Sequence, residues 1–159
     1  MIPESEQGGD PACWAHLFEE RDLVTRADIE DLVRAFYRQV AMDDLLGPVF
    51  AAAGVDWSVH IPKLVDFWAG QLLGERAYDG NPLLAHRPVN AQTPFTAAHY
   101  QRWLDLFEAE VDRGYSGPMA ELAKYRAGRI ASALRRLLAG AAVPAEGPAE
   151  VRLGRHPAT

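Results

Sequence analysis

The chain has 159 residues, of which 48% are hydrophobic and 24% are charged, a balance typical of one soluble globular domain. Its net charge of −6 argues against a nucleic-acid partner, because binding to phosphates usually requires a basic face. No stretch approaches the ~20 consecutive apolar residues of a membrane span, so we expect no membrane partner. The N-terminus lacks the basic and apolar regions of a secretory signal, so we expect a cytoplasmic location.

The two ends of the chain differ in composition from the middle. Residues 1–24 are rich in Gly, Pro and acidic groups, which predicts a partly disordered N-terminal extension. Residues 140–159 carry Pro, Gly and Ala without an apolar period, which predicts a disordered C-terminal tail. The folded domain is therefore expected to span residues 25–139.

The first predicted helix begins at Thr25, where Thr25 and Asp28 resemble a capping box. Apolar residues then follow at the spacing of one helix face: Ile29, Leu32, Val33, Phe36, Tyr37 and Val40. Gly47 and Pro48 break this pattern, so we expect a connection there that delivers Phe50 to the core.

A second helix is predicted over about residues 57–73, with Gly74 as its C-cap. One side of it carries His60, Leu64, Phe67, Trp68 and Leu72. Pro62 follows His60 by two residues, where the interior of a helix would lose a hydrogen bond. Either the helix starts near His60 or it kinks at Pro62.

Two further helices follow. One is predicted over about residues 96–112 and buries Trp103 and Phe107; the other opens near Pro118, a favourable first-turn residue, and ends before Gly140. No alternating strand pattern occurs in the sequence, so the predicted fold class is all-α.

Between the second and third helices lies "GNPLLAHRPVN", residues 80–90. Asn81 is a plausible N-cap and Pro82 fits the first helical position, whereas Arg87 precedes a proline and is pushed out of the α region. The segment therefore predicts a single helical turn over residues 82–87 that aims His86. Without further context, such a histidine is more often an exposed residue than a metal ligand, and His60 with His86 does not make a zinc site.

Four segments, "FYRQVAMDDLLGPVF", "DWSVHIPKLVDFWAGQLLGE", "YDGNPLLAH" and "YQRWLDLFE", together resemble the successive signatures of the truncated haemoglobins of the third group. The resemblance implies a truncated globin fold, a helical sandwich around a haem cleft, and haem b as the cofactor. It matches His86 to the proximal histidine that binds the haem iron. The other ring N–H of His86 is then expected to donate to a backbone carbonyl or a carboxylate.

The same resemblance places Tyr37, His60 and Trp103 on the distal side, where they contact the bound ligand. The alternatives are a core tyrosine, a surface histidine and a packing tryptophan. Apolar pocket wall is expected from Phe36, Phe50, Leu64, Trp68 and Phe107, unless some of these only fill the core. Lys63 matches a base near a haem propionate, with Arg76 and Arg87 as rivals and a solvated surface lysine as the alternative.

The function implied by the resemblance is binding of O2, NO, CO or a similar diatomic ligand, with NO-oxidising or peroxidase-like chemistry as a further expectation. No G-x-G-x-x-G segment is present, so turnover would need an external reductase. The alternatives are a non-catalytic sensor of haem or gas and a helical interaction module without a cofactor.

Overall fold

The computed structural model describes residues 21–139, so the predicted disorder of residues 1–20 and 140–159 lies outside the described part. Within that part the chain forms six helices and no strand, which confirms the all-α prediction. The helices are α1 (Arg26–Met42), α2 (Gly47–Ala52), α3 (Trp57–Leu73), α4 (Pro82–Gln92), α5 (Ala97–Gly114) and α6 (Pro118–Ala139).

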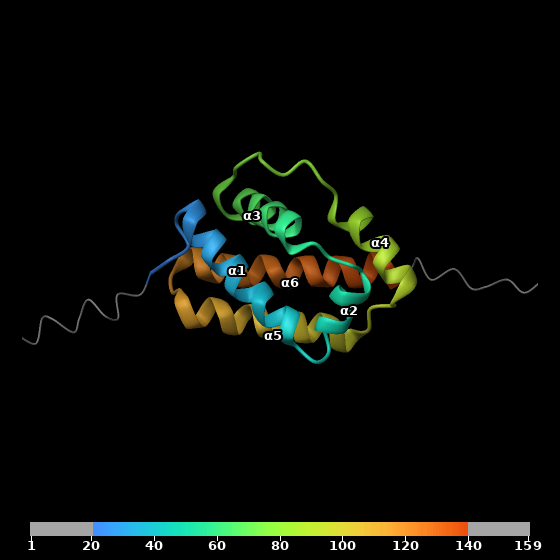
Figure 1. Cartoon of the computed structure of the whole chain (residues 1–159). Coiled ribbons are helices and arrows are strands. Elements are labelled where there is room, and N and C mark those ends of the chain that lie inside the picture. The colour runs from blue at the N-terminus through green and yellow to red at the C-terminus, as the bar shows by residue number, and fades with distance from the viewer. Residues whose placement is uncertain (1–20, 140–159) are drawn as a thin grey trace, which may run out of the picture.

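The arrangement of the helices is built around α1 and α6 (Figure 1). α1 packs on α3 and on α5, and α6 packs on α5, α3 and α4. α5 and α6 run side by side, and α4 lies near the C-terminal end of α6 (Figure 1). No helix within residues 21–139 is long and apolar enough to span a bilayer.

The start and the buried face of α1 are as predicted. The Thr25 hydroxyl accepts a hydrogen bond from the Asp28 amide, and the Asp28 carboxylate accepts one from the Thr25 amide, at 3.2 and 2.9 Å. This reciprocal pair satisfies two amides that the first turn leaves free. The predicted apolar face of α1 is buried throughout, from Ile29 to Val40.

The break at Gly47 and Pro48 is itself the start of α2, a short helix where a connection was predicted. Pro48 lies in the first turn, where its missing N–H costs no hydrogen bond. Gly47 is needed for a close approach, because a Cβ there would lie 2.8 Å from the Ala41 carbonyl oxygen. α2 presents Phe50, half-buried, to the core as expected.

α3 begins at Trp57, because the Asp56 carboxylate caps it by accepting from the Ser58 amide at 3.0 Å. Pro62 therefore lies inside the helix, and the alternative in which the helix starts near His60 is wrong. Gly74 ends α3 with a φ of 70°, which confirms the predicted C-cap.

α4 is longer than the predicted single turn. Its start is as predicted, since the Asn81 side chain accepts from the Leu83 and Leu84 amides. The helix then continues through Pro88 to Gln92, so the prediction that Arg87 leaves the helical region is wrong. A residue before proline prefers an extended backbone, but this preference is weak enough for tertiary packing to override it. In α4 that packing is against α6.

Candidate functional site

Tyr37 lies at the centre of a cluster of aromatic side chains from three helices. Its ring centroid lies 6.1 Å from that of Phe50, 5.8 Å from that of Trp57 and 6.2 Å from that of His60. Tyr37 comes from α1, Phe50 from α2, and Trp57 and His60 from the first turn of α3. The structure therefore brings the predicted distal residues Tyr37 and His60 together.

Trp103 joins this cluster from α5. Burial raises the pKa of the Tyr37 hydroxyl to about 12, although a hydrogen bond from the Trp103 side chain acts in the opposite direction. The indole N–H can only donate, so the Tyr37 oxygen accepts from Trp103. At neutral pH the Tyr37 hydroxyl thus keeps its proton and has that proton available for another acceptor.

His60 is half-buried beside Tyr37. Burial lowers the pKa of its imidazole, and the charges of His86 and Lys63 lower it further. His60 is therefore neutral at pH 7, with one ring nitrogen that donates and one that accepts.

His86 is held in one tautomer by its own helix. Its Nδ1 lies 2.6 Å from the carbonyl oxygen of Pro82, one turn earlier in α4. Because a carbonyl only accepts, Nδ1 donates its proton to it, and Nε2 has no hydrogen-bond partner among the described residues. The hydrogen bond to a backbone carbonyl expected for His86 is therefore present.

α4 is the helix that carries His86, and it is loosely packed. No residue of α4 is buried, and within residues 21–139 α4 contacts α6 but no other helix. An imidazole whose Nδ1 is engaged by a backbone carbonyl can offer Nε2 to a metal ion. His60 contacts Tyr37 on the neighbouring helices, and the Trp103 side chain hydrogen-bonds to Tyr37.

The predicted apolar wall divides into two groups. Phe36, Trp68 and Phe107 are at most 2% exposed, and both Phe36 and Trp68 pack on Phe107, with the Trp68 and Phe107 rings stacked at 4.8 Å between centroids. Trp103 stacks on Phe107 as well, at 5.5 Å. Phe36, Trp68 and Phe107 belong to the buried core, whereas Phe50 and Leu64 are only half-buried and pack against that core.

The three candidate propionate partners occupy different places. Lys63 is exposed on α3, one turn after His60, and Arg87 is exposed on α4. Arg76 lines a hollow of about 520 Å³. This hollow is also lined by Phe67 of α3, by Tyr78 of the connection after α3, and by Pro82, the first residue of α4.

Two residues have contacts that sequence reasoning missed. Trp57 contacts Phe50, Tyr37 and His60, and its spacing of three residues before His60 was the available signal. His99 takes part in a capping box at the start of α5, where its Nδ1 accepts from the Thr96 amide at 2.9 Å. His16 lies outside the described residues.

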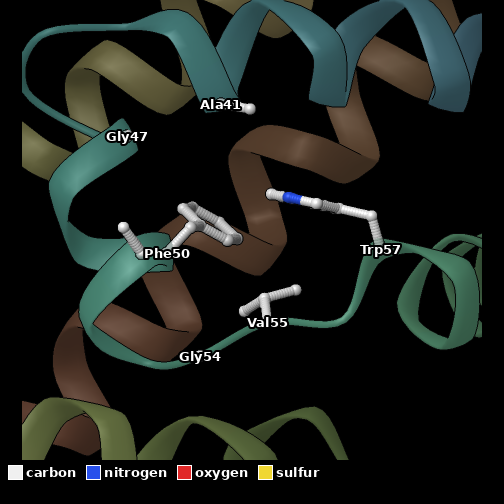
Figure 2. Close-up of a pocket in the computed structure, with 7 residues that line it drawn as sticks. Ala41, Gly47, Phe50, Gly54, Val55 and Trp57 are labelled. Atoms are coloured by element: carbon white, nitrogen blue, oxygen red, sulfur yellow. The ribbon is translucent and has the colours of Figure 1, made fainter.

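A second, smaller hollow of about 150 Å³ lies at the end of α1 beside α2 (Figure 2). Phe50 and Trp57 point into it from opposite sides, and Val55 lies between them (Figure 2). Neither this hollow nor the larger one is lined by Tyr37, His60 or His86.

Comparisons with known proteins agree on one family. The family model described as bacterial-like globin matches residues 20–132, a span that contains Tyr37, His60, His86 and Trp103. A relative, Group 3 truncated hemoglobin ctb of Campylobacter jejuni, is 34% identical over 121 residues, which cover 74% of this chain and 93% of that protein. A crystal structure of group III truncated hemoglobin from Campylobacter jejuni matches with a TM-score of 0.68 at 35% identity, covering 75% of this chain and 94% of that chain.

Proposed function

The chain belongs to the bacterial-like globins, as a truncated haemoglobin of group III, and from this premise we propose that it binds haem b through His86 and takes up a diatomic ligand beside Tyr37, His60 and Trp103. Haem binding is the property of the globin family as a whole, whereas the residue roles are proposed from the match to the family's positions, and the geometry of this chain supports them. The observation that carries the proposal is the hydrogen bond from His86 Nδ1 to the Pro82 carbonyl, because it leaves Nε2 as the only free ligand atom of that ring.

When bound, haem supplies an iron with one open coordination position for a diatomic ligand. The chain's own contribution on the proximal side is orientation. α4 fixes the His86 ring at two points, its backbone and Nδ1, so the Nε2 lone pair has one direction. Lys63, Arg76 and Arg87 are the candidate partners of the propionates: Lys63 and Arg87 are exposed on α3 and α4, and Arg76 lines the larger hollow beside α3.

The distal residues act as hydrogen-bond donors. The Tyr37 hydroxyl accepts from Trp103, so its proton points away from the indole and is free for a ligand. A hydrogen bond to an acceptor with charge contributes ~1.5 to 3 kcal/mol, and each 1.4 kcal/mol is a factor of ~10 in an equilibrium. Strong retention of O2 suits a protein that reacts with it, so we propose NO-oxidising or peroxidase-like chemistry with an external reductase.

The decisive experiment replaces the axial imidazole. Wild type and His86→Gly are loaded with haemin, and absorption spectra of the ferric, ferrous and CO-bound forms are recorded. We expect His86→Gly to lose the iron–imidazole signature and to retain haem weakly, and added free imidazole to restore both. His99→Gln is the matched control, because a glutamine side chain preserves the acceptor of the Thr96 capping box.

Two outcomes would contradict the proposal. If His86→Gly keeps an unchanged axial nitrogen signal without added imidazole, another side chain holds the iron. If the wild type takes up no haemin, the chain acts as a helical interaction module without a cofactor.

A further inference from the structure

The exposed side of α6 carries an excess of positive charge. Residues 122–139 contain no Asp or Glu, although the whole chain has a net charge of −6. The cations in this range are Lys124, Arg126, Arg129, Arg135 and Arg136. The last helix of the domain is therefore basic in a chain that is acidic as a whole.

Lys124 differs from the four arginines because it has partners. Its ammonium group lies 2.7 Å from the carboxylate of Asp112 and 2.8 Å from that of Glu121. The four arginines are all exposed, and none of them forms an ion pair within residues 21–139. Four charges of one sign are consequently left for a partner of the opposite sign.

The spacing of the exposed residues forms a stripe along α6. Tyr125, Arg129, Ser132 and Arg136 follow one another at i, i+4, i+7 and i+11, the period of one helix face, and all four are exposed. We call these four residues the α6 stripe, which is ~16 Å long at about 1.5 Å per residue. Tyr125 is 62% exposed, and Leu137 beside the other end is 48% exposed. Exposed tyrosine and arginine are the residues that contribute most to protein–protein interfaces.

The net charge of the chain favours one class of acidic partner. An anionic membrane or a nucleic acid presents negative charge over a large area, and a chain with a net charge of −6 is repelled by it outside the stripe. The acidic patch of a protein is limited in area and can match the stripe alone. Charge complementarity therefore favours a protein with a compact acidic face.

The α6 stripe lies on a helix that contacts the helix of His86. α4 packs on α6, near the C-terminal end of α6 (Figure 1). From His86, contacts between rings lead to the start of α5, because the Phe95 centroid lies 6.2 Å from that of His86 and 6.0 Å from that of Tyr100. α5 packs on α6 as well. A partner on α6 thus sits beside both helices that lead to the proposed iron ligand.

We propose that the α6 stripe is the docking surface for the electron donor, a protein with an acidic face that carries a reduced flavin or iron–sulfur group. The proposal rests on the proposed function, because it assigns the surface on which the external reductase binds. In each encounter one electron leaves the donor, which is oxidised, and reduces the haem iron from ferric to ferrous. No covalent bond forms or breaks, and no proton is transferred.

The test reverses one charge on the stripe and one away from it. Arg129→Glu reverses a charge within the stripe, and Arg129→Lys keeps it. Arg38→Glu is the matched control, because Arg38 is an exposed cation without an ion pair within residues 21–139. It belongs to α1, which packs on α3 and α5 but not on α6. The probe is a 2Fe–2S ferredoxin of the plant type, an acidic one-electron donor.

Two measurements are made on the wild type and each variant. Stopped-flow mixing with reduced ferredoxin follows reduction of the ferric haem protein at low and high salt. 15N NMR follows binding of oxidised ferredoxin to the protein without haemin and to its CO-bound ferrous form. We expect Arg129→Glu to slow reduction by about tenfold at low salt and to weaken its salt dependence, because steering between opposite charges is screened by salt.

The other two variants should behave like the wild type in both measurements. In the wild type, the NMR shifts caused by ferredoxin should be confined to the α6 stripe and its neighbours, and Arg129→Glu should reduce them. Absorption spectra of the loaded variants check that each holds haem in the same way.

Three outcomes would overturn the proposal. Equal loss of rate in Arg129→Glu and Arg38→Glu would mean that only the net charge matters. If the wild type took up haemin but ferredoxin caused no shifts on the stripe, while vesicles of phosphatidylglycerol did, the stripe would be a membrane-binding face and the proposed function would stand. If ferredoxin bound the stripe but the wild type took up no haemin, the proposed function would fail, and the role of the stripe in electron transfer would fall with it.

Discussion

At the scale of single residues, the site depends on which proton each polar group holds. Burial keeps the Tyr37 hydroxyl protonated, and the Trp103 N–H occupies its oxygen as a donor. Burial keeps His60 neutral, and the Pro82 carbonyl fixes the proton of His86 on Nδ1. Each group is therefore in the form that its proposed role requires before any ligand arrives.

Tyr37→Phe tests the distal donor. The substitution removes the hydroxyl but keeps the ring that packs on Phe36, so haem uptake should be unchanged. Loss of one hydrogen bond to the ligand should speed O2 dissociation by roughly ten- to a hundredfold. Stopped-flow displacement of O2 by CO measures this rate, with Tyr125→Phe as a control because that tyrosine is 62% exposed. Equal rates for the two variants would remove Tyr37 from the site.

His60 gives a pH dependence of stability in the haem-free protein. Its pKa in the folded protein lies below the ordinary value of 6.5, so the unfolded chain takes up a proton at a higher pH than the folded one does. Stability that is present above pH 6.5 is consequently lost as the pH falls through the lowered pKa.

The corresponding measurement is urea unfolding of the wild type and His60→Gln. The stability of the wild type relative to the variant should decline between pH 8 and pH 5, because only the wild type carries this linkage. A difference that is constant or grows toward low pH would show that the folded protein does not disfavour a charged His60.

At the scale of helices, some ends are completed by residues far away in the chain. The Asp22 carboxylate accepts from the Met119 and Ala120 amides at 3.0 and 2.8 Å, at the start of α6. Leu23 beside it is fully buried, so the packing of the domain begins before residue 25. These contacts attach the segment before α1 to the last helix.

Asp22→Ala should destabilise the protein by about 1 to 3 kcal/mol, because two amides of α6 lose their acceptor. Burial raises the pKa of the Asp22 carboxyl, but the hydrogen bonds from Met119, Leu23 and Ala120 outweigh burial and leave the pKa below 3.8. The contribution is therefore present above pH 3.8 and is lost as the pH falls through the lowered pKa. Urea unfolding at pH 7 measures the loss, and Asp79→Ala, an exposed loop aspartate, should show almost none.

At the scale of the whole molecule, the helices are unequally attached. α1 packs on α2, α3 and α5, whereas α4 rests on α6 alone among the described helices and buries none of its residues. Among the described helices, the one that carries His86 is thus the one without a buried residue. A bound group that joins His86 to the residues of α3 would add the contacts that α4 lacks.

Hydrogen exchange followed by mass spectrometry tests this coupling. Haem loading should slow amide exchange in residues 83–92 of α4 far more than in α1 or α5. The reason is that a ligand stabilises the state that binds it by RT ln(1 + [L]/Kd), which is ~4 kcal/mol when the ligand is in thousandfold excess over Kd. His86→Gly should show little of this protection. Equal protection of α4 with and without haem would mean that α4 is held by the protein alone.

The sequence by itself determined the features that depend on near neighbours in the chain. The apolar period of α1, its capping box, the Gly74 C-cap and the Asn81 cap of α4 each involve residues within about one turn of one another. Four ordered segments also pointed to the truncated globin fold, which the structural match at a TM-score of 0.68 confirms.

Only the tertiary structure decided the features that need contacts between distant segments. The extension of α4 through Pro88 accompanies its packing on α6, and the Asp22 cap joins residues 97 and 98 positions apart. The meeting of Trp57 with Phe50 and Tyr37, and the hydrogen bond between Trp103 and Tyr37, join side chains of separate helices. A local pattern carries no information about such pairs, because their energy comes from burial and hydrogen bonding that exist only once the helices have packed.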